Sequence, residues 1–255
     1  HHLADQIHPG LSPWAASQGM TFTTLVEENI LGTGGGIRNA LGHLGAGDFV
    51  VFNGDVLAAP DLSRALAHHR ATGALMTLVL REDPRAHRLG AIEVTAEGEV
   101  VRILNEGPPA SAPTTPCLFT GVYVVSHAIA PELPADGCVV RHTLRRLLAK
   151  GARVSGVIDT NAWYDLGTVG TYARAQFDLL RGKAIFPGFE APREPKYIAP
   201  DARLDGSVTP GEDVIVSSGA RVRGAGALAR TIVWDDAETT APCEGMVVSR
   251  GHRVA

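Results

Sequence analysis

The chain has 255 residues, of which 45% are apolar and 20% charged, and its formal net charge is −4. This composition provides for a sizeable buried core, and a charge so near neutral argues against a DNA-coating protein or a polybasic membrane binder. No uninterrupted apolar run approaches the roughly 20 residues of a membrane-spanning helix. The three cysteines are too few and too far apart for a disulfide framework or a cysteine-rich zinc site, which indicates a reducing compartment.

Residues 21–182 alternate between strand-like and helix-like segments. Strands are predicted, in chain order, at 21–26, 49–52, 74–80, 90–94, 100–104, 118–125, 154–158 and 162–166. Helices are predicted at 36–44, 61–71, 139–150 and 169–180, and a Pro-rich loop at 107–116. The continuous apolar run at 49–52 is typical of a strand buried on both faces. The alternation predicts an α/β fold with a Rossmann-like, mainly parallel sheet wrapped by helices.

Beyond a linker at 183–196 the pattern changes to a period of six. One register holds Ile198, Leu204, Val216, Val222, Leu228 and Trp234, and only Pro210 breaks it. A second register, offset by four, holds Ala202, Val208, Val214, Ala220, Gly226 and Ile232. A period of six suits a parallel β-helix, in which short strands turn corners. We therefore predict three parts: an α/β domain at 1–182, the linker, and hexapeptide repeats at 197–255.

A run of glycines, Gly32-Thr33-Gly34-Gly35-Gly36 after Leu31, precedes the first predicted helix. Glycines let the backbone approach a ligand closely, and a helix N-terminus offers free N–H groups. The run lacks the lysine of a G-x-x-x-x-G-K-[ST] phosphate loop. Asp55 lies near the spacing of the acidic residue in a dinucleotide fingerprint, so a nicotinamide-dependent oxidoreductase stays open at this point. A glycine turn into a helix explains the run equally well.

Two predicted strands end in an aspartate. Asp55 closes Asn53-Gly54-Asp55, and Asp165 lies just before Gly167 and Thr168. Ligands gather at the carboxyl ends of strands in open α/β sheets, and Mg²⁺ prefers one or two carboxylates together with phosphate oxygens. The two aspartates can share one ion if their strands lie close. Capping explains them without a ligand, with Thr168 as the N-cap of the helix at 169–180.

A glycine also interrupts the strand Phe119-Thr120-Gly121-Val122-Tyr123, which often marks a close approach of a ligand or another chain. The ten histidines show no metal-ligand spacing. We expect three of them, His68, His69 and His142, to lie on helix surfaces.

Taken together, these segments resemble the sugar-phosphate nucleotidylyltransferases, which include mannose-1-phosphate guanylyltransferases and N-acetylmuramate-1-phosphate uridylyltransferases. The run 31–36 is similar to the family's L-G-T-A-G-G/P loop, and 53–55 to its N-G-D. Likewise, 120–123 is similar to T-G-[VI]-Y and 163–168 to W-x-D-x-G-T, in the same order. Several members carry a C-terminal left-handed parallel β-helix, which the hexapeptide region resembles.

The resemblance implies transfer of a nucleotidyl group from an NTP to a sugar 1-phosphate, giving an NDP-sugar and pyrophosphate. It implies nucleotide contacts at Leu31, Gly32, Thr33, Gly34, Gly35, Asn53 and Gly54. It also implies sugar contacts at Glu106, Thr120 and Gly121, and catalytic, Mg²⁺-binding carboxylates at Asp55 and Asp165. The implied partners are the two substrates, with no nucleic acid or membrane, and a second copy of the chain through the β-helix. The implied location is the cytoplasm.

Two departures from the family pattern bear on activity. Its opening G-x-G-T-R…P-K-P signature has no counterpart, so we expect the chain to start inside the domain, with roughly 50–60 residues of the pattern not present and little turnover. The lysine of its E-K-P is replaced in Asn105-Glu106-Gly107-Pro108. A non-catalytic regulatory or scaffold relative is therefore the alternative function. A hexapeptide acyltransferase fits least, because only His252 lies in the C-terminal region.

Overall fold

The computed structural model describes residues 1–104, 106–107 and 112–254. The chain forms two compact units, one of residues 1–52 with 61–159 and the other of residues 53–60 with 160–255. The predicted boundaries at 1–182, 183–196 and 197–255 stay a prediction. Within the described residues, no helix has both the length and the apolar character needed to cross a membrane.

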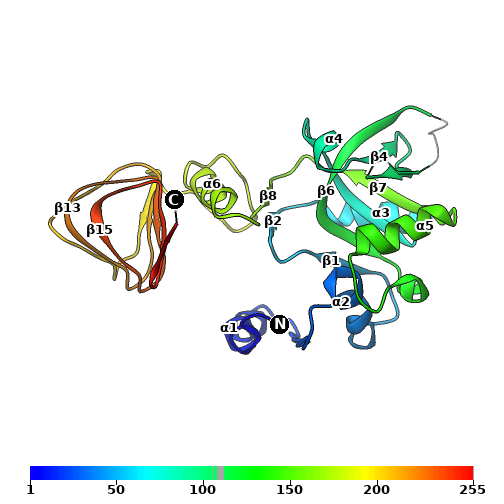
Figure 1. Ribbon diagram of the computed structural model, residues 1–255, viewed down its shortest axis with the longest axis horizontal. Helices are drawn as coiled ribbons and strands as arrows, with labels where there is room; N and C mark the ends of the chain where they lie inside the picture. Colours follow the sequence, from blue (N-terminus) through cyan, green and yellow to red (C-terminus); the bar gives the residue numbers. More distant parts are fainter. Residues whose placement is uncertain (105, 108–111, 255) are drawn as a thin grey trace. The chain divides into compact units, whose positions relative to one another are not determined.

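The first unit holds five α-helices and six strands among its described residues (Figure 1). The helices are α1 (Ala4–Ser17), α2 (Gly32–Ala40), α3 (Leu62–Thr72), α4 (Ala86–Leu89) and α5 (Arg145–Ala149). The strands are β1 (Phe49–Phe52), β3 (Met76–Glu82), β4 (Ile92–Thr95), β5 (Val100–Ile103), β6 (Thr114–Val125) and β7 (Val154–Ile158). Shorter 3₁₀ turns lie at η1 (Leu41–His43) and η2 (His127–Glu132), and the π-helix η3 (Val139–Leu144) leads directly into α5.

The sheet of this unit is mixed, not mainly parallel. Its strand order is β5-β4-β6-β3-β7, and β1 also pairs with β6. Strands β3 and β7 run parallel, whereas β6 runs antiparallel to β1, β3 and β4. The tight turn between β4 and β5 is closed by the N–H of Thr95 donating to the carbonyl of Glu99 at 2.9 Å. Strands joined by so short a turn are antiparallel, because only a crossover connection makes parallel neighbours.

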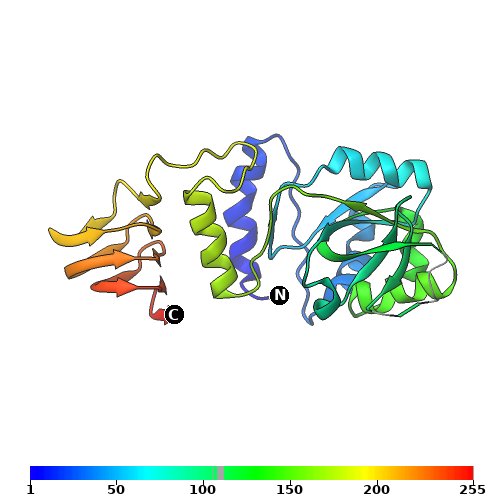
Figure 2. The same cartoon turned by 90° about the horizontal axis from the view of Figure 1, so that it is seen from above.

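Alternating residues of β3 and β6 divide the core between the two faces of the sheet. Val79, Val122 and Val124 pack against Ala65 of α3. Their neighbours Leu78, Leu80 and Tyr123 belong to a larger cluster with Leu144 and Leu147. Figures 1 and 2 accordingly show α3 and α5 on opposite faces of the sheet. The period-two alternation of side chains places helices on both faces.

Four predictions of secondary structure or strand burial for this unit are wrong. Residues 21–26 form no strand, and none of the described strands pairs with them. The first long helix after them begins at Gly32 and not at Gly36, so the glycine run is its first turn. Strand β1 is not buried on both faces, because Val50 and Phe52 are each 42% exposed. The end of the Pro-rich loop predicted at 107–116 is instead part of strand β6, which begins at Thr114. Residues 108–111 of that loop lie outside the described residues.

His69 is buried, which corrects its predicted surface position. The residue is 2% exposed, and its Nδ1 lies 2.8 Å from the hydroxyl of Thr77, which in turn lies 2.6 Å from that of Ser155. On its other side, Nε2 lies 3.6 Å from Oδ1 of Asp48. His68 is half-buried, and His142 is exposed as predicted.

The second unit begins with a two-stranded antiparallel sheet of β2 (Val56–Ala58) and β8 (Trp163–Asp165). Helix α6 (Val169–Leu180) follows β8. The Thr168 hydroxyl accepts a hydrogen bond from the N–H of Thr171, and the Thr171 hydroxyl accepts one from the N–H of Thr168. This reciprocal cap confirms the predicted start of the helix at Val169.

The C-terminal strands of this unit form two sheets. They are β9 (Lys196–Ile198), β10 (Arg203–Leu204), β11 (Ser207–Pro210), β12 (Val214–Val216), β13 (Arg221–Ala229), β14 (Thr231–Val233), β15 (Glu238–Glu244), β16 (Val247–Ser249) and β17 (His252–Val254). The pairs are parallel except β16–β17, and each parallel partner lies about three hexapeptides further along the chain, as Val214 pairs with Thr231. Figure 2 shows these strands stacked in layers.

The two six-residue registers mark the interior of this stack. Val216, Val222 and Leu228 of the first register are at most 1% exposed, and so are Val214 and Ala220 of the second. At the ends of the first register, Ile198 is 36% and Trp234 44% exposed. The period of six therefore identifies the inward positions in the middle of the repeat and not at its ends.

Candidate active site

Asp55 and Asp165 are brought together by the β2–β8 pair. Val56 lies opposite Asp165 in this pair, and the N–H of Leu166 donates a hydrogen bond to the carbonyl of Asp55 at 2.8 Å. Both aspartates therefore lie at the same end of the two-stranded sheet. The sequence placed Asp55 at the end of the strand at 49–52, which pairs with β6; the structure adds β2, a strand that was not predicted, and its pairing with β8.

Gly167 lies beside both carboxylates. A Cβ atom at Gly167 would lie 3.0 Å from Oδ1 of Asp165 and 3.9 Å from Oδ2 of Asp55. Its N–H donates to the same Oδ1 of Asp165 at 2.8 Å, which fixes that side chain. Because Gly167 lacks a side chain, the space between the two carboxylates stays open.

The donor set at this point suits a hard divalent cation. Two carboxylates are what Mg²⁺ takes from a protein when substrate phosphates supply further oxygens. No group of three or more His, Cys, Asp and Glu side chains with metal-binding geometry occurs among the described residues. The described residues therefore do not form a metal site made of protein ligands alone. Asp55 and Asp165 are compatible with a two-carboxylate site that leaves coordination positions for phosphate oxygens.

Asn53 and Gly54 form the turn that leads into β2. The N–H of Val56 lies 3.3 Å from the carbonyl of Asn53, which it donates to, and a Cβ at Gly54 would meet no atom within 4 Å. These two residues belong to the same unit as the paired aspartates. The predicted nucleotide contacts at Asn53 and Gly54 thus lie in an open turn directly before Asp55.

The glycine run packs against a segment of its own unit. A Cβ at Gly32 would lie 2.8 Å from the carbonyl oxygen of Gly137, and one at Gly35 would lie 2.6 Å from that of Ala135. Gly34 donates its N–H to the carbonyl of Gly137 at 2.7 Å, and Leu31 accepts at its carbonyl from the Gly137 N–H at the same distance. The glycines were predicted to let a ligand approach the backbone closely. In the structure, residues 134–137 make this close approach.

Thr33 ties the same two segments together through its side chain. Its hydroxyl accepts a hydrogen bond from the N–H of Val139, the first residue of η3, at 2.9 Å. The first turn of α2 is therefore fixed to the start of η3 by backbone and side-chain bonds.

Thr120 and Gly121 lie at an irregularity in the middle of β6. Gly121 has φ +80°, and the register between β3 and β6 shifts between Leu78 and Leu80. The Thr120 hydroxyl donates to the carbonyl of Val79 at 2.7 Å, and Thr120 is 4% exposed. A left-handed backbone at a bulge requires glycine, so the fold alone accounts for Gly121.

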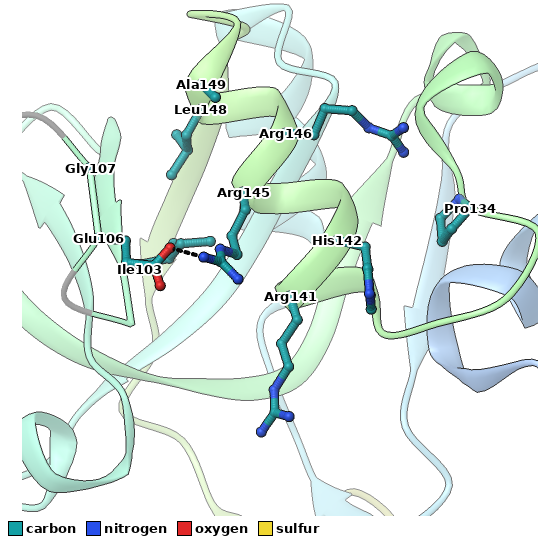
Figure 3. Close-up of a pocket in the computed structure, with 10 residues that line it drawn as sticks. All are labelled: Ile103, Glu106, Gly107, Pro134, Arg141, His142, Arg145, Arg146, Leu148 and Ala149. Carbon is teal, nitrogen blue, oxygen red and sulfur yellow. Dashed lines mark ion pairs between the residues drawn. The ribbon is translucent and has the colours of Figure 1, made fainter.

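Glu106 borders a cavity of about 590 Å³ in the first unit (Figure 3). Its backbone exchanges hydrogen bonds with Ile103 at the end of β5, at 2.7 and 3.0 Å. Its Oε2 forms an ion pair with the guanidinium of Arg145 from α5. The other lining residues that carry charge or can acquire it are Arg141, His142 and Arg146, all from η3 and α5.

These cations were not predicted as site residues. They lie on the helix predicted at 139–150, on which the apolar residues Leu144, Leu147 and Leu148 have helical spacing. Its basic residues, Arg141, Arg145 and Arg146, were the available signal. That they border the same cavity as Glu106 depends on the tertiary packing of the helix, which spacing does not reveal.

Comparison with known proteins finds relatives of this chain. A family model described as nucleotidyl transferase matches residues 5–182. The mannose-1-phosphate guanylyltransferase of Mycobacterium tuberculosis is 33% identical over 88% of this chain and 63% of that protein. The N-acetylmuramate alpha-1-phosphate uridylyltransferase of Caulobacter vibrioides is 31% identical over 66% of this chain and 70% of that protein.

The crystal structure of HddC from Yersinia pseudotuberculosis, complexed with GMP-PN, shares the fold. It aligns with a TM-score of 0.55 at 20% identity, over 68% of this chain and 73% of that chain. The chain spans 63% of the length of the mycobacterial relative. It spans 37% of the length of a glucose-1-phosphate adenylyltransferase from Desulfitobacterium hafniense, which is 26% identical.

Proposed function

Because the chain belongs to the nucleotidyl transferase family, we propose that the protein containing it transfers a nucleotidyl group from an NTP to a sugar 1-phosphate. The products are an NDP-sugar and pyrophosphate. The relatives named for guanylyl, uridylyl and thymidylyl transfer to sugar 1-phosphates support this reaction class.

The observation that carries the proposal is the pairing of Asp55 with Asp165. Both carboxylates flank Gly167, which keeps the space between them free of a side chain. We propose that they hold Mg²⁺, which would neutralise charge on the phosphates of the bound nucleotide. The Gly167 N–H, bonded to Asp165, keeps one carboxylate oriented toward that space.

The proposed reaction requires little of the protein beyond binding and aligning the two substrates. The phosphate of a sugar 1-phosphate is already an anionic nucleophile, so no general base is required. The role of the chain is then to place this nucleophile in line with the α-phosphate and to shield the charge that builds up. Paired carboxylates for a metal, and cations near the second substrate, are the residue types that this task requires.

We assign the remaining predicted residues to the two substrates. The nucleotide is proposed to contact the first turn of α2, at Leu31, Gly32, Thr33, Gly34 and Gly35, and the turn at Asn53 and Gly54. Since residues 134–137 cover the Cα faces of the glycines, contacts to α2 are proposed through its backbone N–H groups other than that of Gly34, which is donated to Gly137; the N–H of Leu31 is likewise donated to Glu27. The sugar is proposed to contact Glu106, Thr120 and Gly121.

For the C-terminal region we propose a left-handed parallel β-helix of hexapeptide repeats that joins copies of the chain. The parallel pairs, such as Arg203 with Arg221, and the buried hexapeptide positions support the repeat. We further propose a cytoplasmic location, where NTPs are available and where the three cysteines, all free, would stay reduced.

The test is pyrophosphate release by the complete protein. Each NTP is combined with mannose, glucose, N-acetylmuramate or glycero-manno-heptose 1-phosphate, with MgCl₂ or with EDTA. We expect release for at least one pair and its loss in EDTA. If no pair gives release while NTP binding is retained, the proposed reaction is wrong and the non-catalytic alternative stands.

A further inference from the structure

The ladder of hydrogen bonds between β2 and β8 ends on a side chain instead of a backbone carbonyl. In an antiparallel pair, hydrogen-bonded and non-hydrogen-bonded residues alternate, so the donors of one strand recur at every second residue. Just beyond β2, the N–H of Ala59 donates to the carbonyl of Ala162 at 3.0 Å. The next donor in this series is the N–H of Asp61, and its acceptor is Oδ2 of Asp159, also at 3.0 Å.

Asp159 and Asp61 are both anchored within the first unit. Asp159 follows β7 directly, is 8% exposed, and donates its N–H to the carbonyl of Leu80 in β3 at 2.8 Å. Asp61 is the N-cap of α3, and its Oδ1 accepts a hydrogen bond from the N–H of Arg64 at 2.9 Å. The Arg64 guanidinium also donates to the carbonyl of Ile158. Two hydrogen bonds therefore fix the start of α3 to the end of β7.

Little within the β2–β8 pair itself specifies its register. Each strand has three residues, and none of the residues in the pair is buried. A two-stranded pair is only marginally stable alone, and strands without a buried face are prone to slip in register. A slip by one residue would move every side chain of a strand to the opposite face, so the approach of Asp165 to Asp55 depends on this register.

Short covalent connections link the two anchored residues to the strands. Residues 59–60 join β2 to Asp61, and residues 160–162 join Asp159 to β8. The bond between Asp61 and Asp159 therefore holds the ladder at one end, as the bond from Leu166 to Asp55 holds it at the other. A carboxylate suits this position, because an N–H donates a stronger hydrogen bond to a charged acceptor than to a neutral carbonyl.

We propose that Asp159 is a positioning residue for Asp55 and Asp165, and that it acts by fixing the register of β2 against β8. This role requires no contact between Asp159 and a substrate or metal ion. The consequence for metal binding rests on the proposed function, whereas the control of the register rests on the hydrogen bonds alone. The competing explanation is that the Asp159 carboxylate only stabilises the start of α3, and the experiments below distinguish the two.

The first test is hydrogen exchange of the complete protein, read by mass spectrometry on peptides covering residues 53–60 and 160–167. In Asp159→Ala both peptides should exchange about tenfold faster or more, the effect of losing a hydrogen bond to a charged group. Peptides covering β3 and β7 should keep their rates. Asp159→Asn retains an oxygen acceptor for the N–H of Asp61 and should restore most of the protection. Unchanged exchange at 53–60 and 160–167, or an equal increase in β3 and β7, would overturn the proposal.

The second test is the Mg²⁺ dependence of pyrophosphate release. For Asp159→Ala we expect the Mg²⁺ concentration for half-maximal release to rise about tenfold or more, as for other residues that orient metal ligands without touching the metal. The control is Asp83→Ala, because Asp83 also follows a strand directly and its Oδ1 accepts a backbone N–H, that of Arg85, at 2.8 Å. This control should leave the Mg²⁺ requirement unchanged. An equal rise in both variants, or no rise in Asp159→Ala, would overturn the effect on the metal site.

Asp61 tests the same hydrogen bond from its donor side, and keeps the proposal testable if Asp159→Ala does not fold. Asp61→Pro removes the N–H, and the φ of −74° at this position is compatible with proline. Asp61→Ala keeps the N–H and removes only the cap of α3. We expect Asp61→Pro, and not Asp61→Ala, to speed exchange at 53–60 and 160–167. Equal effects of the two substitutions would assign them to the loss of the cap and overturn the proposal.

Hydrogen exchange separates this inference from the proposed reaction, because it is measured without substrates. Faster exchange at 53–60 and 160–167 in Asp159→Ala, in a protein that turns over no pair of substrates, would support the register role and count against the reaction. Mg²⁺-dependent turnover, with exchange and Mg²⁺ requirement both unchanged in Asp159→Ala, would overturn the register role and leave the reaction standing.

Discussion

The backbone N–H of Leu166 donates a hydrogen bond to the carbonyl of Asp55, at 2.8 Å. This bond extends the β2–β8 pair by one step and holds residues 53–55 beside residues 165–167, which are more than a hundred positions further along the chain. The two aspartates thereby lie beside each other, as the proposed metal site requires. Their joint action is the basis of the first two predictions.

Removing either carboxylate should abolish most of the activity of the complete protein. For Asp55→Asn and Asp165→Asn we expect kcat to fall by about 100-fold or more, a loss of roughly 2.7 kcal/mol of transition-state stabilisation. The measurement is pyrophosphate release over a series of Mg²⁺ concentrations. Asp235→Asn, an exposed carboxylate in the same unit, is the control. Rates within threefold of the unmodified protein for either variant would show that the carboxylates do not bind the metal.

Gly167→Ala should damage the same site without unfolding it. The new Cβ would lie 3.0 Å from Oδ1 of Asp165 and push that carboxylate away from the space it shares with Asp55. We expect about a tenfold or larger fall in kcat, a higher Mg²⁺ requirement and a melting temperature within a few degrees. Gly170→Ala is the matched control, because a Cβ there meets no atom within 4 Å. Full activity of Gly167→Ala would mean that the spacing of the carboxylates is not critical.

The glycine run should respond as a packing element. In Gly35→Ala the Cβ would lie 2.6 Å from the carbonyl oxygen of Ala135, so one of the two backbone segments must move. We expect the free energy of unfolding to fall by about 1–3 kcal/mol, the usual cost of overpacking. Gly42→Ala, with no atom within 4 Å of its Cβ, should leave it nearly unchanged. Urea denaturation measures both. An unaltered stability in Gly35→Ala would argue that residues 134–137 do not pack against α2 in solution.

His69 should make the protein less stable as the pH falls. Burial lowers the pKa of His69 below its ordinary value of 6.5, and the nearby Asp48 opposes this only in part, while Arg70 and His68 reinforce it. The unfolded chain takes up a proton at this side chain near pH 6.5, whereas the folded chain does so only at lower pH. Stability from this group is therefore complete above pH 6.5 and is lost below it, by at most about 1.4 kcal/mol per pH unit.

The measurement is the urea midpoint between pH 8 and pH 5. In His69→Gln the decline below pH 6.5 should be smaller than in the unmodified chain, although the substitution lowers stability at every pH. His43→Gln, at an exposed position, should keep the decline. An unchanged pH dependence in His69→Gln would assign the decline to other groups.

The sequence predicted best what depends on near neighbours in the chain. Thr168 was expected to cap α6, and it does so through Thr171. The hexapeptide registers predicted that Val216, Val222 and Leu228 point inward, and all three are buried. The strand-end position of Asp165 was also predicted correctly, whereas Asp55 lies in the turn between β1 and β2.

What the sequence did not reveal depends on contacts between distant segments. Gly35 looked like a ligand-binding glycine because its partner, Ala135, is a hundred residues away. His69 lies on a helix with polar neighbours, and only the approach of Thr77 and Asp48 shows that it is buried. Arg141 belongs to a group of basic residues that the sequence shows on a predicted helix, but its position beside Glu106 is set by the packing of Leu144 and Leu147 into the core.

Because its strands pair in parallel at a regular offset along the chain, the C-terminal region can be lengthened or shortened by whole multiples of that offset. Each residue there finds its partner about three hexapeptides away, as Arg221 does with Glu238, so deleting or duplicating one such stretch brings an equivalent residue to the same place. The α/β sheet has no such freedom, because β6 contacts β1, β3 and β4 at once. Evolution can therefore lengthen or shorten the C-terminal region in modular increments while the α/β sheet keeps its dimensions.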